Sequence, residues 1–78
     1  MNKHEFEITA ALNNHDDLTG YGISHFIEVN FHHLIGFGTL YLHLDKLVEN
    51  HKVIRTEQHD KVFTYRLNRE AFKEVKRG

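Results

Sequence analysis

Eight histidines in a chain of 78 residues are the first feature of this sequence that could do chemistry. Imidazole nitrogens bind zinc, copper and nickel, and His25, His32 and His33 lie close together along the chain. The chain has no cysteine, however, and no His-x3-His pair lies on a clearly helical face. We therefore expect surface histidines, several of which titrate near neutral pH, rather than a metal site, and we expect no other cofactor.

Candidate catalytic residues are few. Ser24 is the only serine, and its neighbour His25 cannot assist it, because adjacent residues on a helix do not face each other. Gly36-x-Gly38 lacks both the third glycine and the Lys-Ser/Thr pair of a phosphate-binding loop. We therefore do not expect an enzyme.

The chain carries almost no net charge, and that charge is unevenly distributed. Ten Lys and Arg residues stand against eleven Asp and Glu residues, for a formal net charge of −1. Residues 1–35 hold one of those cations and five of the acids, so an anionic partner should meet the second half of the chain. The length predicts one domain, residues 1–78, and the absence of a signal peptide or a long apolar run predicts a cytoplasmic protein without a membrane segment.

Apolar spacing predicts three helices in the first fifty residues. Residues 4–14 read as a helix with a rough apolar stripe of Phe6, Ile8, Ala11 and Leu12, although Phe6, Ile8 and Ala10 also alternate as they would in a strand. A second helix is expected roughly over 18–30, with Asp17 or Thr19 as its N-cap. Its apolar positions are Tyr21, Ile23, Phe26 and Ile27, and Gly20 and Gly22 suit close helix packing or a tight entry.

The clearest helical signal runs from residue 38 to residue 50. Leu40, Leu44, Leu47 and Val48 form one apolar stripe, with Tyr41 at its edge. Asn50 or His51 is placed to take the left-handed conformation that ends such a helix.

Two strand-like runs follow, over 53–57 and 62–67, joined by the polar residues 58–61. In the second run Phe63, Tyr65 and Leu67 alternate with more polar residues, as in a half-buried strand. Asn68 is then a suitable N-cap for a short last helix. Three helices, a two-stranded hairpin and a short C-terminal helix make an α+β fold, the winged helix-turn-helix, whose third helix is free to enter a major groove.

Three short motifs, in order, resemble those of the PadR-type winged-helix transcriptional regulators. Gly38-Thr39-Leu40-Tyr41 resembles the signature that opens the recognition helix of that family, and Tyr65-Arg66-Leu67 resembles the pattern that closes its wing. Thr19-Gly20-Tyr21-Gly22-Ile23 is similar to the start of its second helix. The resemblance covers roughly residues 6–72.

This sequence departs from the family pattern at three positions. Leu42 stands where the family usually has Pro, Gly36 where it has Ser, and His51 where it has Gly. The family regulators also continue into C-terminal helices that hold the dimer and respond to effectors, whereas this sequence ends at Gly78. Effector sensing through such helices is therefore not expected, and a dimer would need another surface.

Eight residues are candidates for DNA contact. On the third helix, Thr39 and Tyr41 carry hydroxyls that donate to phosphates, and the resemblance places this Tyr at the DNA backbone, while His43 and Lys46 are expected to point outward. Ordinary surface residues of a core helix are the alternative. The wing adds four further candidates: Arg55, His59, Lys61 and Arg66.

The wing candidates also have an alternative interpretation. The charged tip at His59 and Lys61 serves equally well to solvate the hairpin and protect a sheet edge. Cross-strand pairing with Glu57 or Asp60 would neutralise Arg55 or Arg66.

The function expected is that of a small DNA-binding transcriptional regulator, a repressor that reads a two-fold operator as a homodimer. With so few cations on the recognition face, useful affinity nearly requires two copies. The alternative is a winged-helix protein-interaction module, an adaptor or inhibitor that does not bind DNA. Cations gathered on one surface would favour the regulator, and an exposed apolar patch around Phe37 and Leu42 would favour the module.

Overall fold

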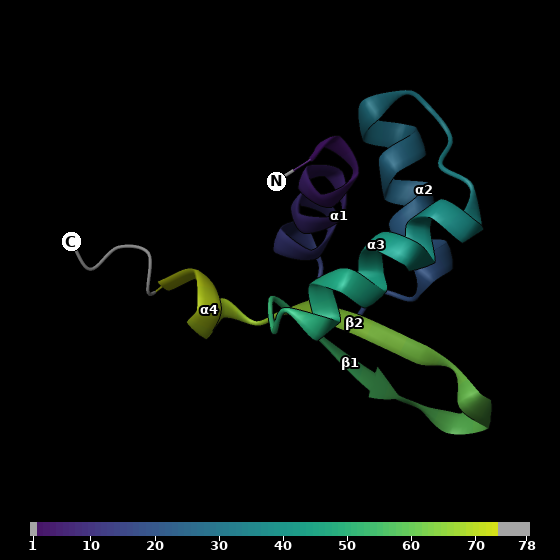
Figure 1. Cartoon of the computed structure of the whole chain (residues 1–78). Helices are drawn as coiled ribbons and strands as arrows, with labels where there is room; N and C mark the ends of the chain where they lie inside the picture. The colour runs from purple at the N-terminus through teal and green to yellow at the C-terminus, as the bar shows by residue number, and fades with distance from the viewer. Residues whose placement is uncertain (1, 74–78) are drawn as a thin grey trace.

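The computed structural model describes residues 2–73 and contains the predicted elements in the predicted order (Figure 1). Three helices come first: α1 (Lys3–Asn14), α2 (Gly20–Phe31) and α3 (Phe37–Glu49). Strands β1 (Val53–Glu57) and β2 (Phe63–Leu67) follow, with a 3-10 turn, η1 (His59–Lys61), between them, and then the short helix α4 (Arg69–Lys73). The α+β prediction is confirmed, with boundaries displaced by no more than two residues from the predicted ones.

Side-chain caps fix where the first two helices begin. The Asn2 side chain accepts a hydrogen bond from the Glu5 amide (2.9 Å), and the Thr19 hydroxyl accepts one from the Gly22 amide (3.1 Å). Each bond satisfies an amide that has no partner within its helix. Residues 4–14 are therefore helical rather than extended, and of the two N-caps considered for α2, Thr19 is the one used.

The core lies between the three helices and the inner face of the hairpin. Of the stripe predicted on α3, Leu40, Leu44 and Leu47 are buried and Val48 is partly buried. The stripe belongs to one core cluster with Ile8 and Leu12 of α1 and with Ile23 and Ile27 of α2. Tyr21 was expected among the apolar positions of α2, but 73% of it is exposed. It lies one residue after the buried Gly20, on the solvent side of the first turn. The fully buried large side chains are Ile8, Leu12, Ile23, Ile27, Leu40, Leu44 and Leu47.

The hairpin is antiparallel, and a short third segment extends it. Val53 pairs with Leu67, and Arg55 pairs with Tyr65. Leu18, in the connection before α2, exchanges two backbone hydrogen bonds with Tyr65 (3.1 and 2.8 Å). This bridge anchors β2 to the helical layer, so the inner part of the hairpin is held while its tip projects beyond the helices (Figure 1).

The alternation predicted for the second strand fails at its outer end. Phe63 is 40% exposed, whereas Thr64 is 8% exposed. The Thr64 hydroxyl accepts a hydrogen bond from the Gln58 side chain (3.0 Å), so the chain of the tip covers this face of β2. Phe63 lies beyond the helices, where no core is available to bury it.

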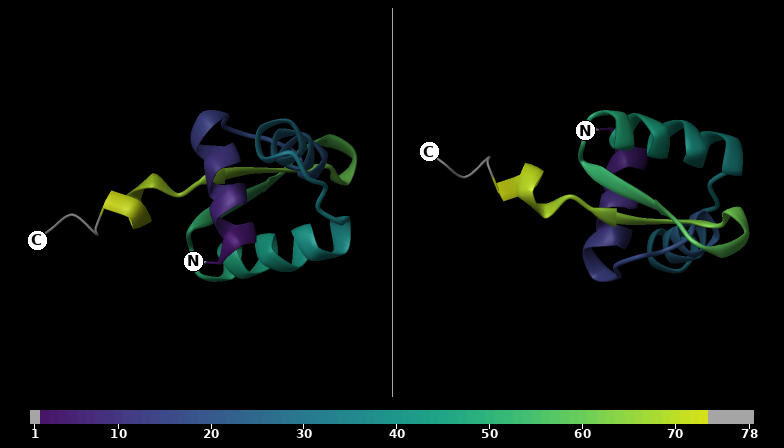
Figure 2. Two further views of the ribbon diagram at one scale, coloured as in Figure 1. Left: turned by 90° about the horizontal axis from the view of Figure 1, so that it is seen from above. Right: turned by 90° about the horizontal axis from the view of Figure 1, so that it is seen from below.

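Asn50 or His51 was expected to take the left-handed conformation after α3. His51 does so (φ 62°), whereas Asn50 does not (φ −88°). Asn68, the expected N-cap of the last helix, stands directly before α4, and its side-chain amide donates to the His51 carbonyl (2.7 Å), which ties the two ends of the hairpin together. Helix α4 then leads away from α2 and α3, on the side opposite the hairpin tip (Figures 1 and 2). No helix within residues 2–73 is long and apolar enough to span a membrane.

Candidate nucleic-acid interface

The outward face of α3 is open, but it is not basic. Lys46 is its exposed cation, and Asp45 and Glu49 are exposed beside it. Thr39 is exposed in the first turn, and 55% of Leu42 is exposed one turn further along. The face therefore offers a hydroxyl, an apolar side chain and one ammonium group, together with two carboxylates that repel phosphate.

The first turn of α3 leaves backbone donors available. Its N-cap, Gly36, makes no side-chain capping hydrogen bond, and the first intrahelical bond runs from the Leu40 amide to the Gly36 carbonyl (2.9 Å). The amides of Phe37, Gly38 and Thr39 precede that bond, so they have no partner within the helix. Space around Gly38 is also open, since a Cβ there would meet no atom within 4 Å.

Tyr41 lies at the edge of this face and against α2. Its ring packs on the backbone of the buried Gly20, and a Cβ at Gly20 would lie 2.6 Å from Tyr41 Cζ and closer still to the hydroxyl oxygen. The Phe37 ring stacks on Tyr41 at 6.3 Å between centroids, and 39% of Tyr41 is exposed. The tyrosine is therefore half core and half surface, and the close packing expected at Gly20 is confirmed.

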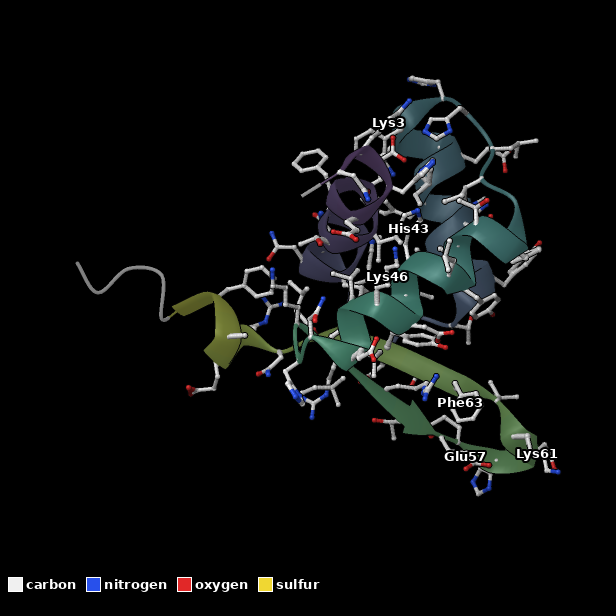
Figure 3. All side chains as sticks on the ribbon, viewed as in Figure 1. Lys3, His43, Lys46, Glu57, Lys61 and Phe63 are labelled. Carbon is white, nitrogen blue, oxygen red and sulfur yellow. The ribbon has the colours of Figure 1, made fainter. Side chains whose placement is uncertain are left out.

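His43 does not point outward, and this expectation was wrong. Its side chain is 13% exposed and lies on the side of α3 that faces α1, with Nδ1 3.7 Å from the Glu5 carboxylate (Figure 3). The His43 and His4 rings lie 5.2 Å apart. On the helix, His43 lies nearer than Lys46 to the buried stripe of α3. Helix α1 packs against this side of α3 and covers the His43 side chain.

Arg55 is held by an acid of α3 and by aromatic residues of its own hairpin. Its Nη1 atom lies 3.4 Å from Asp45 Oδ1, and the guanidinium stands over the Phe63 ring at 5.3 Å. Cross-strand pairing with Glu57 or Asp60 was the alternative considered from the sequence, and Asp45 is the partner instead. Burial raises the pKa of the Tyr65 phenol above its ordinary 10.0, and a hydrogen bond with Arg55 opposes that rise.

The predicted wing cations are divided between surfaces. Arg55 pairs with Tyr65 and so shares its face of the hairpin, while Arg66, opposite Ile54, is on the other face. His59 and Lys61 are exposed on η1 at the tip, where Asp60 and Lys61 both have positive φ (58° and 61°). Lys46, Arg55, Lys61 and Arg66 therefore do not form one continuous basic surface.

An open groove of about 600 Å³ runs between α1 and α4. Phe6, 58% exposed, and Phe72 supply apolar walls, while Arg69 bridges Asn13 (3.1 Å) and Asp16 (3.4 Å) at its rim. Sequence reasoning did not predict this groove. Phe6 was expected on the apolar stripe of α1 with Ile8, Ala11 and Leu12, but only those three are buried, and Phe6 lies in this groove instead.

The histidines do not form a recognisable metal centre in the part of the chain that the structure describes. Within residues 2–73, no three His, Asp or Glu side chains are arranged to hold a metal ion. His32 ends α2 in the left-handed conformation (φ 61°), and His33 bonds to Glu7 instead. Sequence reasoning took Glu7, with Glu5, as an acid suited to the first turn of the helix and did not predict its burial among the apolar residues of α1.

Comparison with solved structures finds close neighbours of the whole fold. RosR of H. salinarum, in crystals grown from NaBr, is 25% identical with a TM-score of 0.83, covering 96% of this chain and 67% of that chain. A complex structure of the same protein gives the same score and identity. A transcriptional regulator from Clostridium thermocellum is 25% identical with a TM-score of 0.79, covering 94% of this chain and 73% of that chain.

No family model matches the sequence, and no curated protein matches it. This chain spans about two thirds of the RosR chains. The neighbours nevertheless identify the fold as the winged helix of transcriptional regulators, as the order of elements predicted.

Proposed function

We propose that this protein is a small DNA-binding transcriptional regulator, without enzymatic activity, that acts in the cytoplasm as a PadR-like repressor. The observation that carries the proposal is the similarity of nearly the whole chain, recognition helix and wing included, to regulators at TM-scores of 0.83 and 0.79. In the proposed complex with DNA, α3 enters the major groove and the hairpin tip lies on the flanking DNA backbone.

The proposed contacts are those that the structure leaves exposed. Thr39 and the free amides of the first turn of α3 face phosphate or base edges, and Lys46 reaches the backbone further along. The Tyr41 hydroxyl lies at the edge of the same surface. At the wing, His59 and Lys61 are free to reach the flank. His43 and Arg66 are left out, because one faces α1 and the other lies on the far face of the hairpin.

The charge of this surface favours two copies on one site. Lys46 is balanced by Asp45 and Glu49, so one protomer neutralises few phosphates. Each neutralised phosphate adds about 0.9 to the slope of log affinity against log salt, and a dimer doubles the number. We propose a homodimer on a two-fold operator for this reason.

The groove between α1 and α4 is the proposed dimer surface. Phe6 and Phe72 are its apolar walls, and Arg69 is already paired with Asp16 at its rim. Two copies facing each other across a two-fold axis would therefore bury aromatic surface without bringing unpaired like charges together. The groove is also on the side of α1 away from α3, so a second copy there leaves the recognition helix open.

Binding to random duplex DNA, measured by fluorescence anisotropy across a salt series, tests the proposal, with sedimentation in parallel. We expect salt-sensitive binding by a dimer, weakened by Lys46→Ala and by Tyr41→Ala. Lys52→Ala is the matched control, since it removes the same charge from an exposed turn after α3. A protein that binds no DNA even at low salt would contradict the proposal.

A protein-interaction module is the second candidate, and two observations favour it. Phe37 and Leu42 are 49% and 55% exposed on α3, where a DNA reader usually presents polar side chains. Asp45 and Glu49 add negative charge to the same helix. Absence of DNA binding, together with capture of a protein partner that Leu42→Glu abolishes, would support this second function.

A further inference from the structure

Glu7 is a carboxylate buried between α1 and the connector that follows α2. It is 2% exposed, although it lies on a helix whose other buried residues are apolar. A buried charge is costly unless hydrogen bonds and a counter-charge compensate it. The groups that face Glu7 are histidines, so its compensation depends on the proton concentration.

His33 compensates one oxygen of Glu7. Its Nε2 atom lies 2.7 Å from Glu7 Oε2, and its Nδ1 atom lies 3.2 Å from the Leu34 carbonyl oxygen. A carbonyl only accepts, so Nδ1 carries a proton, and an ionised carboxylate only accepts, so Nε2 carries one as well. Both ring nitrogens are protonated when both bonds are made, which is the charged imidazolium form.

Two more histidines approach the same cluster. His4 Nδ1 lies 3.9 Å from Glu7 Oε1, and His43 Nδ1 of α3 lies 3.7 Å from Glu5 Oε2. Both of these nitrogens and Glu7 Oε1 are buried and make no hydrogen bond within residues 2–73. These contacts place two further imidazole rings beside the acids of α1.

We infer that Glu5 and Glu7 of α1, with His4, His33 and His43, form a proton-dependent latch. It holds α1 against the connector between α2 and α3 (residues 32–36) and against α3 itself, and these contacts are tightest under mildly acidic conditions. His33 closes the contact with the connector, and His43 closes the contact with α3. Because α3 is the proposed recognition helix, the latch makes DNA affinity depend on pH, a consequence that rests on the proposed function.

The sign of the pH effect follows from His33. Its hydrogen bond to Glu7 raises the pKa of His33 above 6.5, the Leu34 carbonyl raises it further, and partial desolvation and Lys3 oppose the rise. A group whose pKa is higher in the folded state contributes its full stability below its unfolded pKa. That contribution is lost as the pH rises through the folded pKa, so the latch loosens toward alkaline pH.

The test is urea unfolding of the full chain between pH 5.5 and pH 8.5, with EDTA present to remove adventitious metal. We expect the unfolding midpoint of the wild type to fall toward alkaline pH, and to fall less in Glu7→Gln, which keeps the shape of Glu7 without its charge. His25→Gln, on the exposed face of α2, is the control and should keep the wild-type dependence. Parallel pH profiles for wild type and Glu7→Gln would overturn the inference.

A second measurement covers the case in which Glu7→Gln does not fold. Nitrogen-15 NMR of the wild-type imidazoles should show that His33 loses its proton above its ordinary pKa of 6.5, with both His33 nitrogens protonated below that point. Loss of the His33 proton at or below its ordinary pKa would overturn the latch.

DNA binding is measured separately, so the two proposals fail independently. If the wild type binds no DNA at any pH, the regulator proposal fails, while the unfolding and NMR results still decide the latch. If DNA is bound with the same pH dependence in wild type and Glu7→Gln, the coupling of the latch to α3 is wrong. The general gain in positive charge at low pH is common to both proteins and cancels in this comparison.

Discussion

Asp45 of α3 and Arg55 of β1 form an ion pair, with 3.4 Å between carboxylate and guanidinium, that joins the recognition helix to the wing. The Phe63 ring beneath the guanidinium holds it in place. Both charged side chains remain well exposed, at 64% for Asp45 and 40% for Arg55. The pair therefore contributes little to stability, but it neutralises a cation on the surface that we propose faces DNA.

Replacing Asp45 should strengthen DNA binding. Asp45→Asn removes an acid and frees Arg55, so we expect several-fold tighter binding at low salt and a log–log salt slope steeper by up to about 0.9. Stability should change by less than about 1 kcal/mol, as is usual for exposed pairs. Glu49→Gln removes the same charge from α3 without freeing an arginine, and a salt slope equal to that of Asp45→Asn would contradict the role given to Arg55.

Close packing of Gly20 against Tyr41 predicts a specific cost for a methyl group. Gly20→Ala places its Cβ against the tyrosine ring, which must swing toward solvent, and we expect a loss of about 1–3 kcal/mol. Thermal or urea unfolding measures it. Gly38→Ala is the matched control, because the space there is open, and it should be neutral or stabilising by up to about 1 kcal/mol.

The same contact gives a double-mutant test. In a Tyr41→Ala background the cost of Gly20→Ala should disappear, because the ring that opposes the new methyl is gone. An undiminished cost in that background would show that the strain comes from the backbone of α2 and not from Tyr41.

Most of the fold could be predicted from sequence patterns that span only a few residues. The stripe Leu40, Leu44, Leu47 and Val48 predicts α3 because every third or fourth residue faces the core; the three leucines are buried and Val48 is partly buried. Thr19 predicts a helix start because its hydroxyl caps the next amides, and it does so. Helix periodicity and N-capping depend on residues three or four positions apart, so the sequence alone is sufficient to predict them.

The errors arise where distant segments meet. His43 faces inward because α1, nearly forty residues earlier, packs over it, and no periodicity in α3 reveals that. Phe63 is exposed because it lies beyond the helices, and Thr64 is covered because the Gln58 side chain bonds to its hydroxyl. The acid that pairs with Arg55 is Asp45 of α3 and not Glu57 or Asp60 of its own hairpin. Candidate site residues depend on such tertiary contacts more than core residues do.

The proposed dimer surface predicts a change in oligomeric state from one substitution. Phe6→Glu puts a charge into the groove between α1 and α4, and we expect sedimentation to show a monomer. Its DNA affinity should then fall and its salt slope should decrease by about half. Val29→Glu is the control, since Val29 is similarly exposed (55%) but lies on α2 outside the groove. A Phe6→Glu protein that still sediments as a dimer would contradict this surface.

Leu42 predicts which bases the recognition helix reads. It is the exposed apolar residue of the outward face, 55% accessible, and an apolar side chain in the major groove finds its partner in the C5-methyl group of thymine. Operators enriched from random duplexes should therefore carry an A·T pair at the position that Leu42 reaches. Replacing that thymine by uracil removes only the methyl group, and burial of one such group is worth roughly 0.8 kcal/mol, or about a fourfold change in affinity.

A substitution of Leu42 tests the same contact from the protein side. Leu42→Ala should bind the thymine and uracil duplexes with nearly equal affinity, because the side chain that contacts the methyl group has been shortened. Uracil placed outside the contacted half-site is the control for general effects of the base change. If the wild type shows no preference for thymine at any position of an operator that it binds, then Leu42 does not read the groove. Its exposure would then favour the protein-interaction function, which Leu42→Glu tests directly.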